Sequence, residues 1–189
     1  VDPEAPLGSY QTGNRSEDPM LKAVATVLCL MATPLMADMG QFPRVTAQDL
    51  NGRSVTLPKD LPSDPSIVIA AFKRTDQAAV DTWVEGMDLK GALDGRWIEL
   101  PVIARGWRVM KPVIDNGMRS GITAAKDRAR AITLFRNRKE FVALFGKERF
   151  DRIYVLVVAR DGTISHVESG TYSPQGAERI LAAMGQTAE

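Results

Sequence analysis

The residues best suited to chemistry lie in the stretch AFKRTDQAAVDTW, residues 71–83, where an apolar run gives way to a helical pattern. Lys73 and Arg74 precede the expected helix, and the backbone N–H groups at a helix N-terminus favour anions. The stretch therefore predicts either a site for phosphate or a small carboxylate, or solvated loop residues with Asp76 complementing the helix dipole. No paired carboxylates, glycine-rich phosphate loop or metal-ligand spacing accompanies it.

The chain has one cysteine, Cys29, and one histidine, His166. An intramolecular disulfide and a Cys/His zinc cluster are excluded, because each needs more of these side chains. His166 lies in the alternating segment TISHVESG, which is typical of a solvent-facing strand position. We therefore expect no metal, no cofactor and no histidine-based triad.

The first forty residues differ in character from the rest. Residues 1–19 are polar and rich in Pro and Gly, and we interpret them as a disordered extension or a start-site artefact. Residues 20–37 carry one charge, Lys22, then an uncharged run that ends at Ala37. This pattern predicts a cleaved signal peptide, with an N-terminal membrane anchor as the alternative. Residues 38–189 then form an exported domain without a thiol.

The 189 residues, 44% apolar and 25% charged with a net charge of +1, fit one globular domain. The charge is unevenly distributed, because residues 105–152 contain 13 Lys/Arg and five Asp/Glu. This excess predicts either a solvated surface or a face for an anionic partner. The candidate basic surface consists of Lys126, Arg128, Arg130, Arg136, Arg138 and Lys139.

Alternation and turn signals predict the elements that must position these residues. RVTAQDLNGRSVTLP predicts a hairpin with a two-residue turn at Asn51-Gly52. The apolar runs at 66–72 and 152–159 predict strands that are covered on both faces. Asp161-Gly162 predicts a turn into a further strand. Two further strands are predicted at 96–104 and 131–135.

Four helices are predicted from caps and apolar stripes. Thr75 caps the first, whose stripe is Val80, Trp83, Val84 and Met87, and a short second helix has Val113, Ile114 and Met118 on one face. Asn137 and Glu140 cap the third, and the last begins at Ser173 with the stripe Ala177, Ile180, Leu181 and Met184.

This order predicts an α/β fold in which one mixed sheet lies between two helix layers, with an N-terminal β-hairpin. From Phe42 to Met184 it resembles the thioredoxin-like superfamily in its peroxiredoxin and thiol-reductase form. The likeness is carried by DLNGRSVTL, SIVIAAF, ITLFRNRKEFVALFG and IYVLVVARDGTISHVESG. The last segment, extended to Arg152, also resembles the mitochondrial ATP-synthase assembly-factor family, which is similar in fold and lacks redox cysteines.

The resemblance implies that a reactive cysteine would lie where the strand meets the helix, since helix N-termini stabilise thiolates. The window from Arg74 to Ala79 has none, and the proline that the superfamily places before the antiparallel strand is absent from ERFDRIYV. We therefore expect no thiol-disulfide or peroxidase activity. Arg152 should lie opposite Asp76, so that an ion pair fills the vacated site. The candidate degenerate site consists of Lys73, Arg74, Thr75, Asp76, Gln77, Asp151 and Arg152.

The sequence thus predicts a non-catalytic, exported binding or assembly module, periplasmic or secreted. We expect its partner to be another protein of the cell envelope, with an anionic membrane surface as the alternative and no nucleic acid. A second hypothesis is an enzyme or receptor that uses Lys73 and Arg74 to hold a small anionic ligand.

Overall fold

The structure, a computed structural model, describes residues 40–185, and its centre is the strand predicted from SIVIAAF. All six residues of this strand, β3 (Ser66–Ala71), are buried, as expected for a strand between two helix layers. The described residues belong to one compact unit. The predicted extension, signal peptide and Cys29 lie outside the described residues.

Seven strands form one sheet. The strands besides β3 are β1 (Val45–Asp49), β2 (Ser54–Leu57), β4 (Trp97–Ile103), β5 (Ile132–Phe135), β6 (Tyr154–Val158) and β7 (Ile164–Ser169). The helices are η1 (Arg74–Asp76), α2 (Gln77–Gly86), η2 (Arg105–Met110), α3 (Lys111–Gly121), α4 (Ala125–Arg130), α5 (Arg138–Ala143) and α6 (Pro174–Ala183).

The sheet is mixed, in the order β2-β1-β5-β4-β3-β6-β7. The three central strands β5, β4 and β3 run parallel, and their neighbours β1 and β6 run antiparallel to them. The carboxyl ends of the parallel strands and the amino ends of β1 and β6 therefore lie along one edge. Open α/β sheets commonly bind ligands at this edge.

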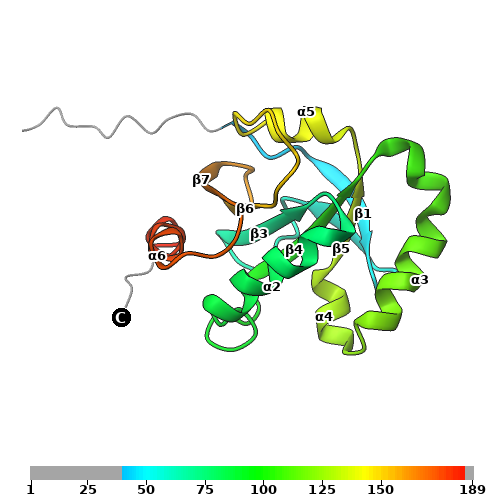
Figure 1. Ribbon diagram of the computed structural model, residues 1–189, viewed down its shortest axis with the longest axis horizontal. Coiled ribbons are helices and arrows are strands. Elements are labelled where there is room, and N and C mark those ends of the chain that lie inside the picture. Colours follow the sequence, from blue (N-terminus) through cyan, green and yellow to red (C-terminus); the bar gives the residue numbers. More distant parts are fainter. Residues whose placement is uncertain (1–39, 186–189) are drawn as a thin grey trace, which may run out of the picture. The chain divides into compact units, whose positions relative to one another are not determined.

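Each face of the sheet carries its own core. Val68, Ala70 and Phe72 pack with residues of α5 and of the β1–β2 hairpin, while Ile67 and Ile69 pack with α2 and α6. Figure 1 shows α5 on one side of the sheet and α2 on the other. The alternation of one strand between two cores explains why its sequence is apolar throughout. The expected three-layer α/β arrangement with an N-terminal hairpin is confirmed.

The predicted two-residue turn of the β1–β2 hairpin is wrong, because the loop has three residues. Asp49 N–H donates to the carbonyl oxygen of Arg53 at 3.0 Å, so strand pairing ends there and Leu50, Asn51 and Gly52 form the loop. Gly52 has a φ of 85°, the left-handed conformation expected of the third residue in such a loop. The Asp49 carboxylate accepts hydrogen bonds from the backbone N–H groups of Asn51 and Arg53 and fixes the turn.

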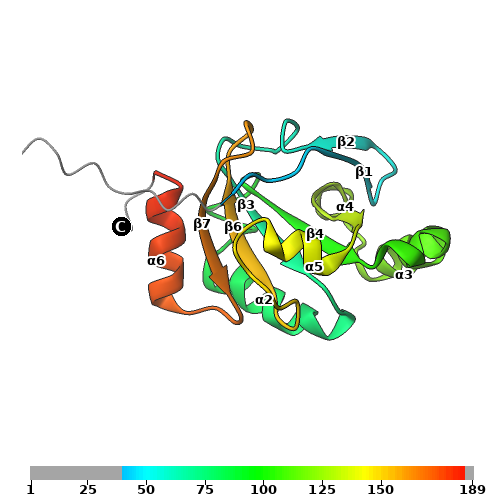
Figure 2. The ribbon, with the colours of Figure 1, turned by 90° about the horizontal axis from the view of Figure 1, so that it is seen from above.

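The segment between β4 and β5 differs from the sequence analysis in two places. Residues 125–130 form α4, a helix that the sequence patterns did not predict. The predicted short helix is α3, but its Val113 is 63% exposed, whereas Ile114 and Met118 are partly buried. Trp107, Val109 and Met110 of η2 are exposed as well. Figures 1 and 2 both show α3 at the opposite end of the domain from α6.

Candidate functional site

Asp76 organises the junction between β3 and α2. Its side chain is buried, and its Oδ2 accepts hydrogen bonds from the backbone N–H groups of Phe72 at 2.9 Å and Lys73 at 3.0 Å. We had expected Asp76 to complement the helix dipole from solvent, but its carboxylate turns back toward the end of the strand. The anion at this junction is thus part of the chain itself.

The other predicted residues of the junction are exposed. Lys73, Arg74, Thr75 and Gln77 all face solvent. Thr75 was predicted to cap α2, but no side-chain hydrogen bond caps this helix, which begins two residues later. The Gln77 amide instead donates to Asp81 along the helix, at 3.0 Å.

The predicted ion pair between Asp76 and Arg152 is not formed among the described residues. Arg152 Nε lies 3.3 Å from Asp151 Oδ1, and Arg149 binds the other oxygen of the same carboxylate. The hydrogen bond from Arg149 lowers the pKa of Asp151 to about 2. Arg149 and Arg152 pair with Asp151 and not with Asp76, because Asp151 lies within two residues of both along the chain.

Arg138, the first residue of α5, reaches the same junction. Its Nη1 donates to the carbonyl oxygen of Phe72 at 3.0 Å, and its guanidinium carbon lies 5.1 Å from the ring centroid of Phe150. Asn137 caps α5 as predicted, since its side-chain oxygen accepts from the backbone N–H groups of Lys139 and Glu140. The cap fixes the start of the helix that carries Arg138.

The predicted basic surface separates into two parts, and the α4 part is largely structural. Arg130 contacts Asp94 and Asp127, and its guanidinium carbon lies 5.4 Å from the ring centroid of Trp97. Arg128 donates to Asn51 Oδ1 and to the carbonyl oxygens of Ile122 and Thr123. Lys126 is exposed. Two of these three cations therefore hold α4 and adjacent loops in place.

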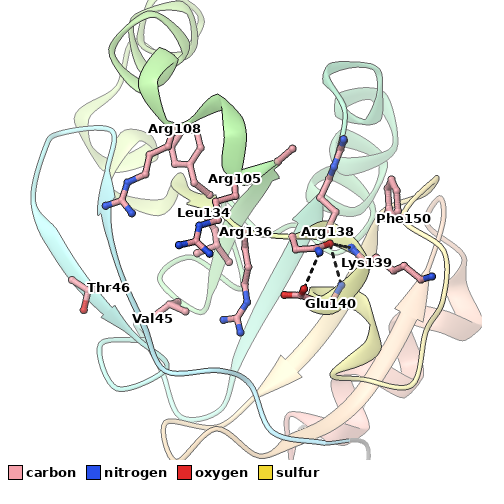
Figure 3. A pocket seen from close by; sticks show the side chains of 13 residues that line it. Val45, Thr46, Arg105, Arg108, Leu134, Arg136, Arg138, Lys139, Glu140 and Phe150 are labelled. Atoms are coloured by element: carbon pink, nitrogen blue, oxygen red, sulfur yellow. Dashed lines mark hydrogen bonds between the residues drawn. The ribbon is translucent and has the colours of Figure 1, made fainter.

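The remaining predicted cations, Arg136, Arg138 and Lys139, line a cleft of about 880 Å³. Arg105 and Arg108 of η2 line it as well, and Glu140 is the one carboxylate among its lining residues. We call this the basic cleft; its remaining lining residues are Val45, Thr46, Ala104, Leu134, Phe135, Asn137 and Phe150. Figure 3 shows Arg105, Arg108 and Arg136 projecting into the opening across from Val45 and Thr46.

Among residues 40–185, no group of three His, Cys, Asp or Glu side chains is placed to hold a metal ion. His166 lies on β7, with Nε2 2.6 Å from Glu168, and Glu168 also binds Arg179. The hydrogen bond from Arg179 lowers the pKa of Glu168. No described helix has the length and apolarity needed to cross a membrane.

The architecture matches solved structures at low sequence identity. A thio-disulfide isomerase from Thermus thermophilus is 18% identical, over 79% of this chain and 97% of that one, with a TM-score of 0.50. The exposed lipoprotein thioredoxin Etrx1 from Streptococcus pneumoniae is 10% identical, over 74% and 98%, also with a TM-score of 0.50. BsSco, of the Sco family of cytochrome c oxidase assembly proteins, is 12% identical, over 77% and 92%, with a TM-score of 0.51.

The fold of this chain is thioredoxin-like. At these identities the likeness establishes the fold and leaves the activity open. No protein-family model and no curated protein matches the chain. The sequence has a single cysteine, so a thioredoxin-like pair of cysteines cannot form within it.

Sequence reasoning found three of the five cations of the basic cleft and missed Arg105 and Arg108. These two follow β4, whereas the other three follow β5, so 28 or more positions of chain separate the groups. The available signal was topological. Parallel neighbouring strands place the residues after their carboxyl ends at one edge, and an arginine following each strand indicates a shared cationic site there.

Proposed function

We propose that this thioredoxin-like domain is a non-catalytic binding module that recognises an acidic partner through the basic cleft. The observation that carries this proposal is the ratio of five cations to one carboxylate in a single cleft. A concentration of one sign of charge in a hollow focuses the field there and attracts ligands of the opposite sign. The volume of about 880 Å³ lies within the range of ligand sites in proteins.

Binding is favoured over thiol chemistry by the contents of the strand-to-helix junction. The N–H groups of Phe72 and Lys73 at this junction already donate to the Asp76 carboxylate. A thiolate or a small external anion near them would meet a negative charge. The same repulsion argues against the alternative of a small anionic ligand held by Lys73 and Arg74.

The signal-peptide pattern of residues 20–37 supports an activity outside the cytoplasm. One solved structure of similar fold is an exposed lipoprotein thioredoxin, and another belongs to a family of assembly proteins. These likenesses support a partner in the cell envelope, and we propose that it is a protein. Export also separates the domain from nucleic acid.

Fluorescence anisotropy with labelled poly-L-glutamate tests the proposal. The variant Arg105→Ala/Arg136→Ala should weaken binding at least tenfold, because it removes two of the five cations from the cleft. The fold should be preserved, because neither side chain makes a described hydrogen bond or ion pair within the domain. The control Lys73→Ala/Arg74→Ala at the junction carries the same loss of two charges elsewhere. Equal weakening in both variants would show that net charge alone attracts the probe and would contradict a cleft-specific function.

A further inference from the structure

The sheet is incomplete where β1 meets β5. Their antiparallel pairing consists of Gln48 with Thr133 and Asp49 with Ile132, and it stops there although both strands continue. In this register the next partners would be Ala47 with Leu134 and Thr46 with Phe135. These pairs are not formed, and Thr46, Leu134 and Phe135 instead line the basic cleft. The cleft is therefore in part an opening between two strands of one sheet.

The hydrogen-bonding groups of both strands face this opening. Leu50 N–H donates to Ala131 O, across the β1–β5 seam, while Asp49 N–H donates to Arg53 within the hairpin. Because backbone groups alternate in direction along a strand, those of Thr46 point the same way as those of Leu50, toward β5. On β5, Arg136 N–H donates to Ile103 of β4, so the groups of Phe135 point toward β1. Each strand thus presents a backbone donor and acceptor to the opening.

The inner end of the opening is polar. A second hollow of about 370 Å³ shares Thr46, Arg108, Leu134 and Phe135 with the basic cleft and extends it over Gln48, Ser54 and Thr133. The Thr133 side chain is 2% exposed, and its Oγ1 has no hydrogen-bond partner within the described part of the chain. An unpaired buried hydroxyl beside an opening is a feature that a ligand with hydrogen-bonding groups would satisfy.

Cations line the side of the opening that faces β1. Arg105 and Arg108 approach from η2, and Arg136 follows directly after β5. Lys111 lines the second hollow but binds Asp115, so its charge is compensated within the domain. A ligand in the opening would therefore meet backbone hydrogen-bonding groups together with guanidiniums that pair with no carboxylate in the described part of the chain.

We infer that the basic cleft takes an extended acidic polypeptide segment, whose backbone pairs with Thr46 and Phe135 between β1 and β5 while its carboxylates bind Arg105, Arg108 and Arg136. This rests on the proposed function and specifies its ligand. A small anion would satisfy the guanidiniums but would leave the two strands unpaired. A membrane surface is flat and has no backbone groups to offer, so it does not fit an opening within a sheet. Addition of a strand satisfies both features at once.

An octaglutamate peptide is a suitable probe, because like charges keep it extended. Isothermal titration should give saturable binding that weakens at least tenfold when every second residue of the peptide is N-methylated. That change removes backbone donors and keeps every charge. Binding should also weaken at high salt, since the screening length falls from about 10 Å at 0.1 M to about 3 Å at 1 M. Hydrogen exchange should show tenfold protection at the amides of Thr46 and Phe135, and none along β7.

A pair of variants tests the same point from the protein. Thr46→Pro removes the backbone N–H that faces the opening. It should leave the hydrogen bonds between β1 and β2 intact, because the backbone N–H and carbonyl groups of Thr46 point away from β2. It should weaken binding of octaglutamate about tenfold relative to Thr46→Ala, which loses the same side chain but keeps the N–H. Melting temperatures of both variants measure whether the hairpin has been preserved.

Equal binding of the N-methylated peptide, or of inorganic pyrophosphate, would overturn the strand-pairing inference and leave an anion-binding cleft. Binding of phosphatidylglycerol vesicles that octaglutamate does not displace would favour the membrane instead. Failure of octaglutamate, pyrophosphate and these vesicles to bind at all would overturn the proposed function as well. If Thr46→Pro unfolds the domain, the comparison of the two peptides on the unmodified protein still decides.

Discussion

Arg138 and Phe72 are joined by a hydrogen bond of 3.0 Å from the guanidinium Nη1 to the backbone carbonyl oxygen. The backbone N–H group of Phe72 donates to Asp76 Oδ2 at 2.9 Å. Both backbone groups at the end of β3 are thus held by charged side chains, one from α5 and one from the start of α2. Arg138 and Asp76 therefore hold the junction from two sides. Each binds the backbone of Phe72, so the two side chains do not need to contact each other.

Replacement of Arg138 should therefore destabilise the domain. Arg138→Ala leaves the Phe72 carbonyl without its donor and removes the contact with Phe150, so we expect a loss of about 1–2 kcal/mol of unfolding free energy. Urea denaturation measures it. Lys139→Ala, one residue along and exposed, is the matched control and should stay within about 0.5 kcal/mol. Equal losses in both variants would show that the Phe72 contact contributes nothing.

Asp76 should matter for stability and not for binding. Asp76→Ala leaves two backbone N–H groups without an acceptor, which should cost about 1–3 kcal/mol. The exposed neighbour Thr75 provides the control Thr75→Ala. Affinity for poly-L-glutamate should be unchanged in Asp76→Ala, and a gain in affinity would mean that the junction belongs to the binding site after all.

Glu99 on β4 makes stability depend on pH. Burial, reinforced by the charge of Asp81, raises the pKa of Glu99 from 4.5 to about 7. A raised carboxyl pKa means that the folded domain holds the proton more tightly than the unfolded chain, so stability falls as pH rises from about 4.5 through 7.

The variant Glu99→Gln should remove this dependence. We expect it to match the unmodified protein near pH 4.5 and to exceed it by about 1–3 kcal/mol at pH 8, as each pKa unit corresponds to about 1.4 kcal/mol. Denaturation curves at the two pH values measure the difference. A parallel pH dependence in both proteins would assign the effect to another group.

Residues 38–189 should show no thiol-disulfide or peroxidase activity, because the sequence contains no cysteine after Cys29. Insulin-reduction and peroxide-consumption assays should give the rates of buffer alone. Adding a known thioredoxin to the same reaction verifies that turnover would have been detected. Reproducible turnover by the pure domain would contradict the binding hypothesis directly.

The protein in its native host should begin at Asp38. Lys22, the uncharged run and the small residue Ala37 predict cleavage at this junction, and intact mass spectrometry of the purified protein measures it. A chain that retains residues 20–37 would instead support the N-terminal anchor or a cytoplasmic location.

The fold was predictable because its main elements are encoded locally. Two apolar runs predicted β3 and β6, and the stripes with Trp83 and Ile180 predicted helices whose stripe residues are buried or partly buried. By contrast, α4 has no apolar stripe. It is held by Arg128 and Arg130, whose partners Asn51, Asp94 and Trp97 are distant in sequence. Hydrophobic periodicity cannot reveal a helix that is fixed by long-range polar contacts.

The site was less predictable, because its defining features are tertiary. The prediction grouped cations that are close along the chain, and it therefore put Arg130 and Arg136 in one surface. In the structure Arg130 pairs with Asp94, whereas Arg136 lines the basic cleft. The opening beside Thr46 depends on where β1 and β5 stop pairing, and no glycine or proline in either strand marks that point. Nothing local marks the end of a register.

The β1–β2 hairpin is attached to the domain on both sides of the opening. At the turn, Leu50 O accepts from Arg119 at 2.5 Å and Asn51 Nδ2 donates to Ala125 O at 2.9 Å. Just before β1, Phe42 N–H donates to Gly162 O at 2.8 Å. None of these bonds involves Thr46 or Phe135, so a peptide that entered the opening would leave the hairpin anchored at both places.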